Sequence, residues 1–328
     1  MLTSEILRRV REIQVRTGRQ VADVLAGEYV SVFKGRGMEF DEVRPYVHGD
    51  DVRTIDWNVT ARTGEPHVKR YVEERQLTLM LMADVSASQD FGSTTRSKRE
   101  AAAELCALLA FSATRNDDKV GLALFHGDIE QYIPPRKGQK HALRVVREVL
   151  AHGSDESGGT TPTALRTASR SWLPSWLRSP LERFQRPRVA REATDVANAV
   201  EFVMQVTTRR TICFVVSDFL DDGFEQAMVA ANRKHDVIAV LVTDPHELDV
   251  PDVGLVALRD AESGENQLVD TGSSAFRRQI ADRAQTRISE LEHRFRSIGI
   301  DFIHIDAAGD VVDPLVRFFR MRGQRSRR

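Results

Sequence analysis

Residues 77–88 read LTLMLMADVSAS, a strongly apolar run that ends in Asp84, Ser86 and Ser88. An unbroken apolar run is typical of a strand buried on both faces of a parallel sheet. In such sheets, ligands bind beyond the carboxyl ends of the strands. One carboxylate and two hydroxyls are hard oxygen ligands, which suit Mg²⁺ or Mn²⁺ better than Zn²⁺. The run therefore predicts a divalent cation at the end of a buried strand.

Strand-like and helix-like segments alternate after this run. This alternation predicts an α/β fold with a doubly wound, mostly parallel sheet that helices cover on both faces. The predicted strands are 77–83, 120–125, 211–217, 237–242 and 302–305, with a short strand near 129–133. The predicted helices are 97–114, 139–150, 223–233 and 274–297.

The chain divides into a small module, a main domain and a basic tail. In the first part, 1–75, a mostly helical apolar spacing over 4–26 precedes short β-type runs within a glycine- and acid-rich stretch. The main domain is expected over 76–322, and 323–328 form an arginine-rich tail. Residues 170–192 hold two of the three tryptophans among prolines and arginines, so we expect an insert there that is not one continuous helix.

The composition is that of a globular protein with balanced charge. Of its 328 residues, 41% are hydrophobic and 29% are charged, with 47 Lys and Arg against 48 Asp and Glu. This balance gives no overall field that would favour nucleic acid. No apolar stretch approaches the roughly 20 residues of a membrane span. Cys106 and Cys213 lie in apolar runs and are expected to be buried thiols, so we predict a cytoplasmic protein without disulfides.

Two later positions extend the predicted metal site. Thr160 lies in the loop Ser157–Pro162 (SGGTTP), and Asp218 ends the apolar run FVVSD in the same way as Asp84 ends the first strand. Mg²⁺ accepts such a set, because it keeps several waters and needs few protein oxygens. Thr161 is an alternative to Thr160. A plainer interpretation is a polar turn in which Ser88 or a nearby hydroxyl caps the next helix and the Gly-Gly loop caps another.

In order and spacing, Asp84, Ser86, Ser88, Thr160 and Asp218 resemble the metal-ion-dependent adhesion site of von Willebrand factor A domains. The resemblance implies direct ligation by the two serines and, in one state of the site, by Thr160. It also implies that the two aspartates anchor the metal and orient its waters. The cage carries few negative charges, so the bound ion would stay electrophilic and take a carboxylate from a partner protein.

The stretch GRGMEFDEVRPYVHGDDVRTIDWNVTARTGEPHVKRYVEER (35–75) resembles the signature of the bacterial family called domain of unknown function 58. So do Asp244-Pro245 and the segment from Asp260 to Asp270. Members look like von Willebrand A-type proteins encoded near MoxR-type AAA+ ATPases, which they are thought to assist in remodelling other proteins. The resemblance therefore implies a non-enzymatic accessory protein that binds its partner through Mg²⁺ or Mn²⁺.

Other motifs leave alternatives open. Carboxylates at strand ends, together with Asp50, Asp51 and Asp56, are compatible with a metal-dependent phosphoester hydrolase. For that cluster, however, ion pairs and turn formation are the simpler expectation, with Trp57 as the hydrophobic anchor of the loop.

The insert 170–192 could dock a partner, lie on a membrane surface or cover its own domain. The tail 323–328 is expected to be solvated, and we do not expect specific nucleic-acid binding.

Overall fold

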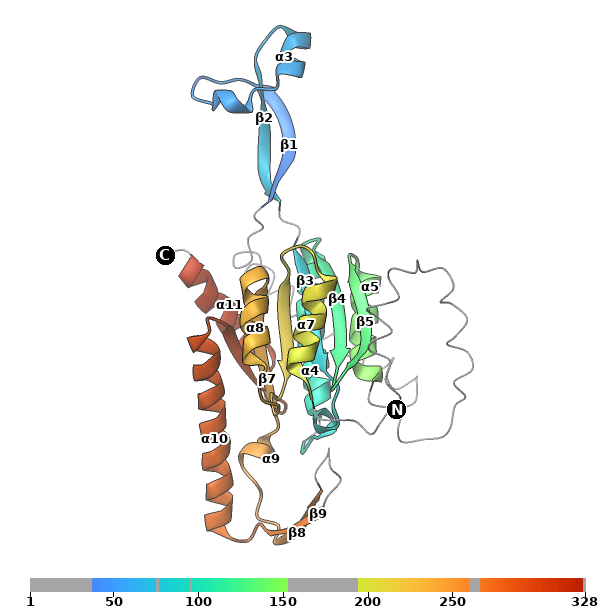
Figure 1. The fold of residues 1–328 in the computed structure, drawn as a ribbon, viewed down its shortest axis with the longest axis vertical. Helices are drawn as coiled ribbons and strands as arrows, with labels where there is room; N and C mark the ends of the chain where they lie inside the picture. The colour runs from blue at the N-terminus through green and yellow to red at the C-terminus, as the bar shows by residue number, and fades with distance from the viewer. Residues whose placement is uncertain (1–36, 75–76, 95, 153–193, 260–265, 327–328) are drawn as a thin grey trace, which may run out of the picture.

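The computed structural model describes residues 37–74, 77–94, 96–152, 194–259 and 266–326 (Figure 1). Its centre is a six-stranded sheet in the order β10-β7-β6-β3-β4-β5. All neighbours in this sheet are parallel except β4 and β5. The strands are β3 (Thr78–Asp84), β4 (Lys119–Phe125), β5 (Ile129–Arg136), β6 (Ile212–Ser217), β7 (Asp236–Thr243) and β10 (Asp301–Asp306).

Helices pack on both faces of this sheet, so the predicted α/β fold class is confirmed. Side chains of β3 alternate between the two cores, Leu79 and Leu81 facing one and Met80 and Met82 the other. The first core also contains residues of α4 (Lys98–Arg115), α5 (Gln139–Ala151) and α11 (Val312–Ser326). The second contains residues of α7 (Val196–Val206), α8 (Glu225–Lys234) and α10 (Ser274–Ser297).

The strand order changes direction between β3 and β6. From β3 the chain proceeds through β4 to β5 on one side, then returns to β6, β7 and β10 on the other. This is the topological switch point, at which open α/β sheets bind ligands beyond the carboxyl ends of their strands. Ala83 pairs with Val216 across these two strands, so the residues that follow both strands emerge side by side.

A β-hairpin projects from the sheet at the amino-terminal ends of its parallel strands, opposite to their carboxyl ends (Figure 1). Its strands, β1 (Gly37–Pro45) and β2 (His67–Glu74), are antiparallel, and the short helix α3 (Trp57–Thr63) lies at its tip with the 3-10 turn Val52–Thr54. Trp57 is 70% exposed, so its predicted role as a buried anchor is wrong. The tip is too small to enclose an indole, because two strands and a seven-residue helix supply no second layer.

A second small hairpin lies beyond the carboxyl edge. It consists of β8 (Leu255–Arg259) and β9 (Asn266–Asp270), and it joins the short helix α9 (Pro245–Leu248) to α10. The sequence patterns identified neither this hairpin, nor α7, nor α11. The boundary that we expected at 322 lies inside α11, and the predicted helix 4–26 and insert 170–192 lie outside the described residues.

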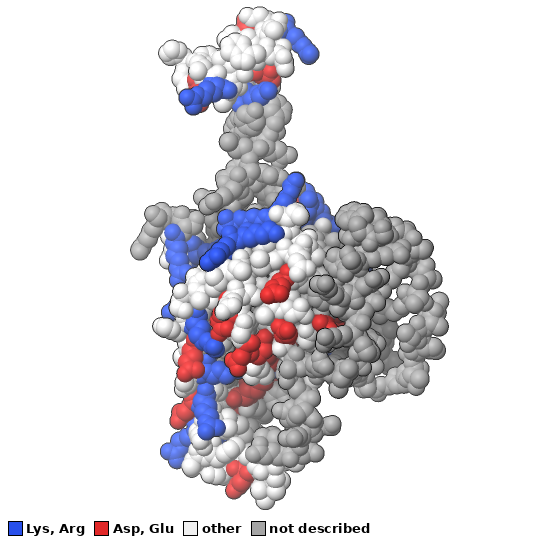
Figure 2. All heavy atoms as spheres, viewed as in Figure 1, with Lys and Arg blue, Asp and Glu red and all other residues white. Residues whose placement is uncertain are grey.

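No helix among the described residues is long and apolar enough to cross a membrane. On the face drawn in Figure 2, basic side chains gather at the end of the domain nearer the β1–β2 hairpin. Acidic and basic side chains intermix elsewhere on that face. The balanced composition is therefore not spread evenly over the surface.

Candidate metal centre

Asp84 lies at the end of β3, where the sheet changes direction. Its side chain is almost completely buried, at 3% exposure. One carboxylate oxygen accepts the Ser86 N–H at 2.8 Å, and the other accepts the Ser217 hydroxyl at 2.7 Å. Because Ser217 ends the neighbouring strand β6, this hydrogen bond joins the two strand ends that the sequence analysis predicted would meet.

Ser86 and Ser88 follow Asp84 in a tight turn that includes the 3-10 helix Ala87–Asp90. Both side chains are buried, and their hydroxyl oxygens lie 2.9 Å apart. Neither serine caps α4, because Ser97 caps this helix and forms a reciprocal capping box with Glu100. Ser88 is therefore not the helix cap, and another hydroxyl of the same segment, that of Ser97, has this role. The hydroxyls of Ser86 and Ser88 instead face each other beside Asp84.

Asp218 follows β6 and is 2% exposed. Its carboxylate oxygen Oδ2 lies 3.0 Å from the Nζ of Lys98, and its Oδ1 is buried without a hydrogen-bond partner among the described residues. Its main-chain carbonyl accepts a hydrogen bond from Arg287 of α10. The next residue, Phe219, has a φ of 49°, so the chain turns sharply here and is held in a region that L-residues rarely occupy.

The electrostatics of this edge indicate a deficit of positive charge. Burial, followed by repulsion from Asp218, raises the pKa of Asp84 to about 6. Burial also raises the pKa of Asp221 to about 6, with repulsion from Asp84 and Asp195 contributing. One oxygen of Asp221 is buried and unpartnered among the described residues. The sequence analysis did not select Asp221, although it lies only three residues beyond Asp218.

These residues fit a small, hard divalent cation. The pair of facing hydroxyls and the unpartnered Asp218 oxygen supply oxygen ligands, while Asp84 is fixed by two hydrogen bonds and would act through the bound water. No group of three or more His, Cys, Asp or Glu side chains suited to a metal occurs in the described part of the chain. A centre here would therefore depend on hydroxyls. Thr160 and its alternative Thr161 lie outside the described residues.

Lys98 is the second residue of this edge that sequence patterns missed. It is the first residue of α4, and its side chain is 1% exposed. Its ammonium group contacts Asp218 and also Glu247 of α9, at 2.6 Å. Burial alone would lower the pKa of Lys98, but the two carboxylates raise it overall, so the side chain is a fixed cation.

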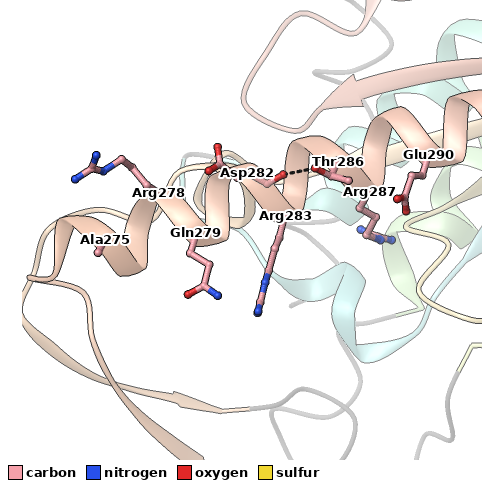
Figure 3. Close-up of a pocket in the computed structure, with 8 residues that line it drawn as sticks. All are labelled: Ala275, Arg278, Gln279, Asp282, Arg283, Thr286, Arg287 and Glu290. Carbon is pink, nitrogen blue, oxygen red and sulfur yellow. Dashed lines mark hydrogen bonds between the residues drawn. The ribbon is translucent and has the colours of Figure 1, made fainter.

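A shallow depression of about 650 Å³ runs along α10 towards this edge (Figure 3). All of its described lining residues come from this one helix, which makes it an open surface rather than an enclosed ligand cavity. Arg287, one of the lining residues, donates side-chain hydrogen bonds to the carbonyls of Asp218 and Phe219. None of its described lining residues is a candidate metal ligand, so Arg287 is its link to the loop that carries Asp218.

The carboxylates at the tip of the β1–β2 hairpin have structural partners. Asp50 forms a bidentate pair with Arg44 at 2.7 and 2.8 Å. Asp51 caps the 3-10 turn, and Asp56 caps α3 and contacts Lys69 at 3.4 Å. The expectation that this cluster forms ion pairs and turns is confirmed.

The chain is 29% identical over 314 residues to an uncharacterized protein of Mycobacterium tuberculosis, which covers 95% of this chain and 88% of the relative. Among solved structures, a conserved hypothetical protein, BatB, from Bacteroides thetaiotaomicron is 16% identical, with a TM-score of 0.42, over 76% of this chain and 99% of that one. The SpRpn10 VWA domain is 12% identical, with a TM-score of 0.33, over 73% and 93%. The model of a family described as "Protein of unknown function DUF58" matches residues 42–290. The chain belongs to this family.

Proposed function

We propose that this protein is a non-enzymatic, Mg²⁺-dependent protein-binding module. Its metal would be held at the carboxyl edge of the sheet by Ser86, Ser88, Asp218 and Thr160, with Asp84 orienting the bound water. The single observation that carries the proposal is the buried Asp218 Oδ1, which has no hydrogen-bond partner among the described residues. It belongs to the strand end next to the one that bears two buried serine hydroxyls, neither of which caps a helix.

The donor set favours docking over hydrolysis. Both oxygens of Asp84 accept hydrogen bonds from the protein, so this carboxylate is anchored rather than free to accept a proton from a water or a substrate. Mg²⁺ with few charged protein ligands remains electrophilic and takes further oxygens from outside. A carboxylate on a partner protein is a suitable sixth ligand.

The family resemblance supports a proposal for the class of partner. We propose a MoxR-type AAA+ ATPase or its client, with this protein acting as an accessory in the assembly or remodelling of protein complexes. The carboxyl edge would then carry the partner, while the β1–β2 hairpin at the opposite edge remains available for other contacts.

Binding of the purified protein to a MoxR-type ATPase of the same organism tests the proposal. Complex formation is measured in Mg²⁺ and in EDTA for the wild type, for Ser86→Ala and for the control Ser289→Ala, whose hydroxyl donates to a carbonyl on exposed α10. We expect the wild type and the control to bind in Mg²⁺ and not in EDTA, and Ser86→Ala to bind in neither. Equal binding in EDTA, or by Ser86→Ala, would refute the metal-bridged mode.

The alternative function, phosphoester hydrolysis, is tested with the same preparations. A panel of phosphoesters is incubated with the wild type and Asp84→Asn in Mg²⁺ and in Mn²⁺. Turnover by the wild type that is lost in Asp84→Asn would establish the hydrolase in place of the docking module.

A further inference from the structure

Lys98 occupies a position that is unfavourable for a cation in two respects. It is the first residue of α4, where the helix dipole presents its positive end and repels a lysine. Its side chain is also almost fully buried, and burial of an ammonium is costly unless it is paired. A lysine is not needed there for the helix itself, because Ser97 and Glu100 already satisfy its first turn.

The contacts of Lys98 connect three strand-end loops. Its own helix follows β3, Asp218 follows β6, and Glu247 belongs to α9, which follows β7. The loop before Lys98 is tied to the same place, because Ser93 donates two hydrogen bonds to the carboxylate of Asp244. The ammonium group is therefore a fixed part of the carboxyl edge, within contact distance of a candidate metal ligand.

A count of charges shows what this cation changes. Asp84, Asp218 and Lys98 together leave one net negative charge in the buried part of the centre. A bound divalent ion adds two positive charges, and Lys98 makes the loaded centre one charge more positive than it would be without the lysine, whether or not the nearby Asp221 is counted. Glu247 is 36% exposed, so water screens much of its charge.

We propose that Lys98 is a built-in counter-cation that weakens metal binding and makes the loaded centre one charge more positive, which favours an anionic ligand such as a partner's carboxylate. This inference rests on the proposed function and assigns the ligand preference of the same centre. Because Lys98 shares Asp218 with the metal, it also keeps this ligand in place when no metal is bound.

The test measures metal and carboxylate binding separately. Mn²⁺ binding is titrated by electron paramagnetic resonance, and acetate binding is followed by the loss of water proton relaxation as acetate displaces Mn²⁺-bound water. For Lys98→Met, we expect at least about tenfold tighter Mn²⁺ binding, since the substitution removes a like charge that contacts the proposed ligand Asp218. Acetate should bind that complex at least about fivefold more weakly. Lys98→Arg keeps the charge and should resemble the wild type in both measurements.

A second variant avoids any folding defect of a buried substitution. Glu247→Gln removes the half-exposed partner and leaves the ammonium compensated by Asp218 alone. We expect several-fold weaker Mn²⁺ binding in this variant. The same change in a Lys98→Met background should have little effect, because the coupling passes through Lys98.

The outcomes separate the two proposals. If the wild type binds Mn²⁺ and neither Lys98→Met nor Glu247→Gln alters its affinity, the role of Lys98 is refuted and the docking module stands. If folded wild type, Lys98→Met and Glu247→Gln all fail to bind Mn²⁺, the proposed function itself is refuted, and the inference with it. Tighter metal binding accompanied by weaker acetate binding in Lys98→Met supports the inference.

Discussion

Replacement of Asp84 by asparagine should stabilise the metal-free protein at neutral pH. An asparagine can still accept the Ser86 N–H, and the Ser217 hydroxyl can turn to accept from its amide, so both hydrogen bonds are retained. What the substitution removes is a buried negative charge that lacks a cation. A buried carboxylate without a compensating cation destabilises the folded state.

The size of this effect follows from the pKa of Asp84. In the unfolded chain an aspartate has a pKa of about 3.9, whereas in the folded protein burial and Asp218 raise the pKa of Asp84 to about 6. Between these values the folded state binds more protons, so stability contributed by this group decreases as pH rises and reaches its low plateau above about pH 6. The difference corresponds to about 3 kcal/mol at pH 8, as an upper value, and to almost nothing below pH 4.

Chemical denaturation followed by far-ultraviolet circular dichroism measures this in EDTA between pH 4 and pH 8. The quantity of interest is the difference between the wild type and Asp84→Asn, which cancels the titration of all other groups. Asp222→Asn, at an exposed carboxylate of the loop after β6, is the matched control and should show no such trend. In Mg²⁺ the order should reverse, because only the wild type gains from the ion.

A constant difference across this pH range would refute the electrostatic argument, as would a less stable Asp84→Asn at pH 8 in EDTA. Either result would mean that Asp84 is compensated by a charge or hydrogen bond beyond those described. The same data in Mg²⁺ would then show whether the ion contributes to folding at all.

Three further predictions concern other parts of the chain. Arg322→Met should lower the free energy of unfolding by about 1–3 kcal/mol in a denaturant titration, because Arg322 joins α11 to Asp236 and Asp301 at the sheet edge; Arg317→Met, on the same helix, is its control. Trp57→Ala should change that free energy by less than about 0.5 kcal/mol, since the indole is 70% exposed, and a larger loss would show that it packs against something. Burial raises the pKa of both Cys106 and Cys213 to about 12, so neither thiol should react with a disulfide reagent at pH 8 until denaturant is added.

The strand ends could be predicted because their information is local. Apolar runs that stop at Asp84 and Asp218 predict both the strands and their polar ends, and parallel strands present those ends at one edge. The structure confirms the sheet and brings Asp84, Ser86 and Ser88 together, with Asp218 beside the neighbouring strand end. Thr160 stays a prediction, since its loop lies outside the described residues.

Charged residues with distant partners could not be predicted in this way. Arg322 lies immediately before the predicted basic tail 323–328, and no sequence pattern predicts that it pairs with Asp236 and Asp301 across the fold. The sequence predicts Trp57 as the hydrophobic anchor of its loop, but the tip of a two-stranded hairpin has no layer to bury it. In both cases, three-dimensional neighbours determine the environment, and no sequence period reports them.

Lys98 combines these two situations and shows why the candidate site was incomplete at the level of sequence. On its own, a lysine after Ser97 indicates only the solvated first turn of an amphipathic helix. Its partners lie 120 and 149 residues later in the chain, at the ends of two other strands. Because β3 and β6 are adjacent, the segments that follow them lie side by side. Lys98, at the start of α4, therefore meets Asp218 for the same reason that Asp84 meets Ser217. The topology that brings the hydroxyls and carboxylates of the proposed cation site together thus also brings a protein cation next to them. We therefore expect the affinity of this edge for a metal to depend on competition between the metal and the Lys98 ammonium group for Asp218.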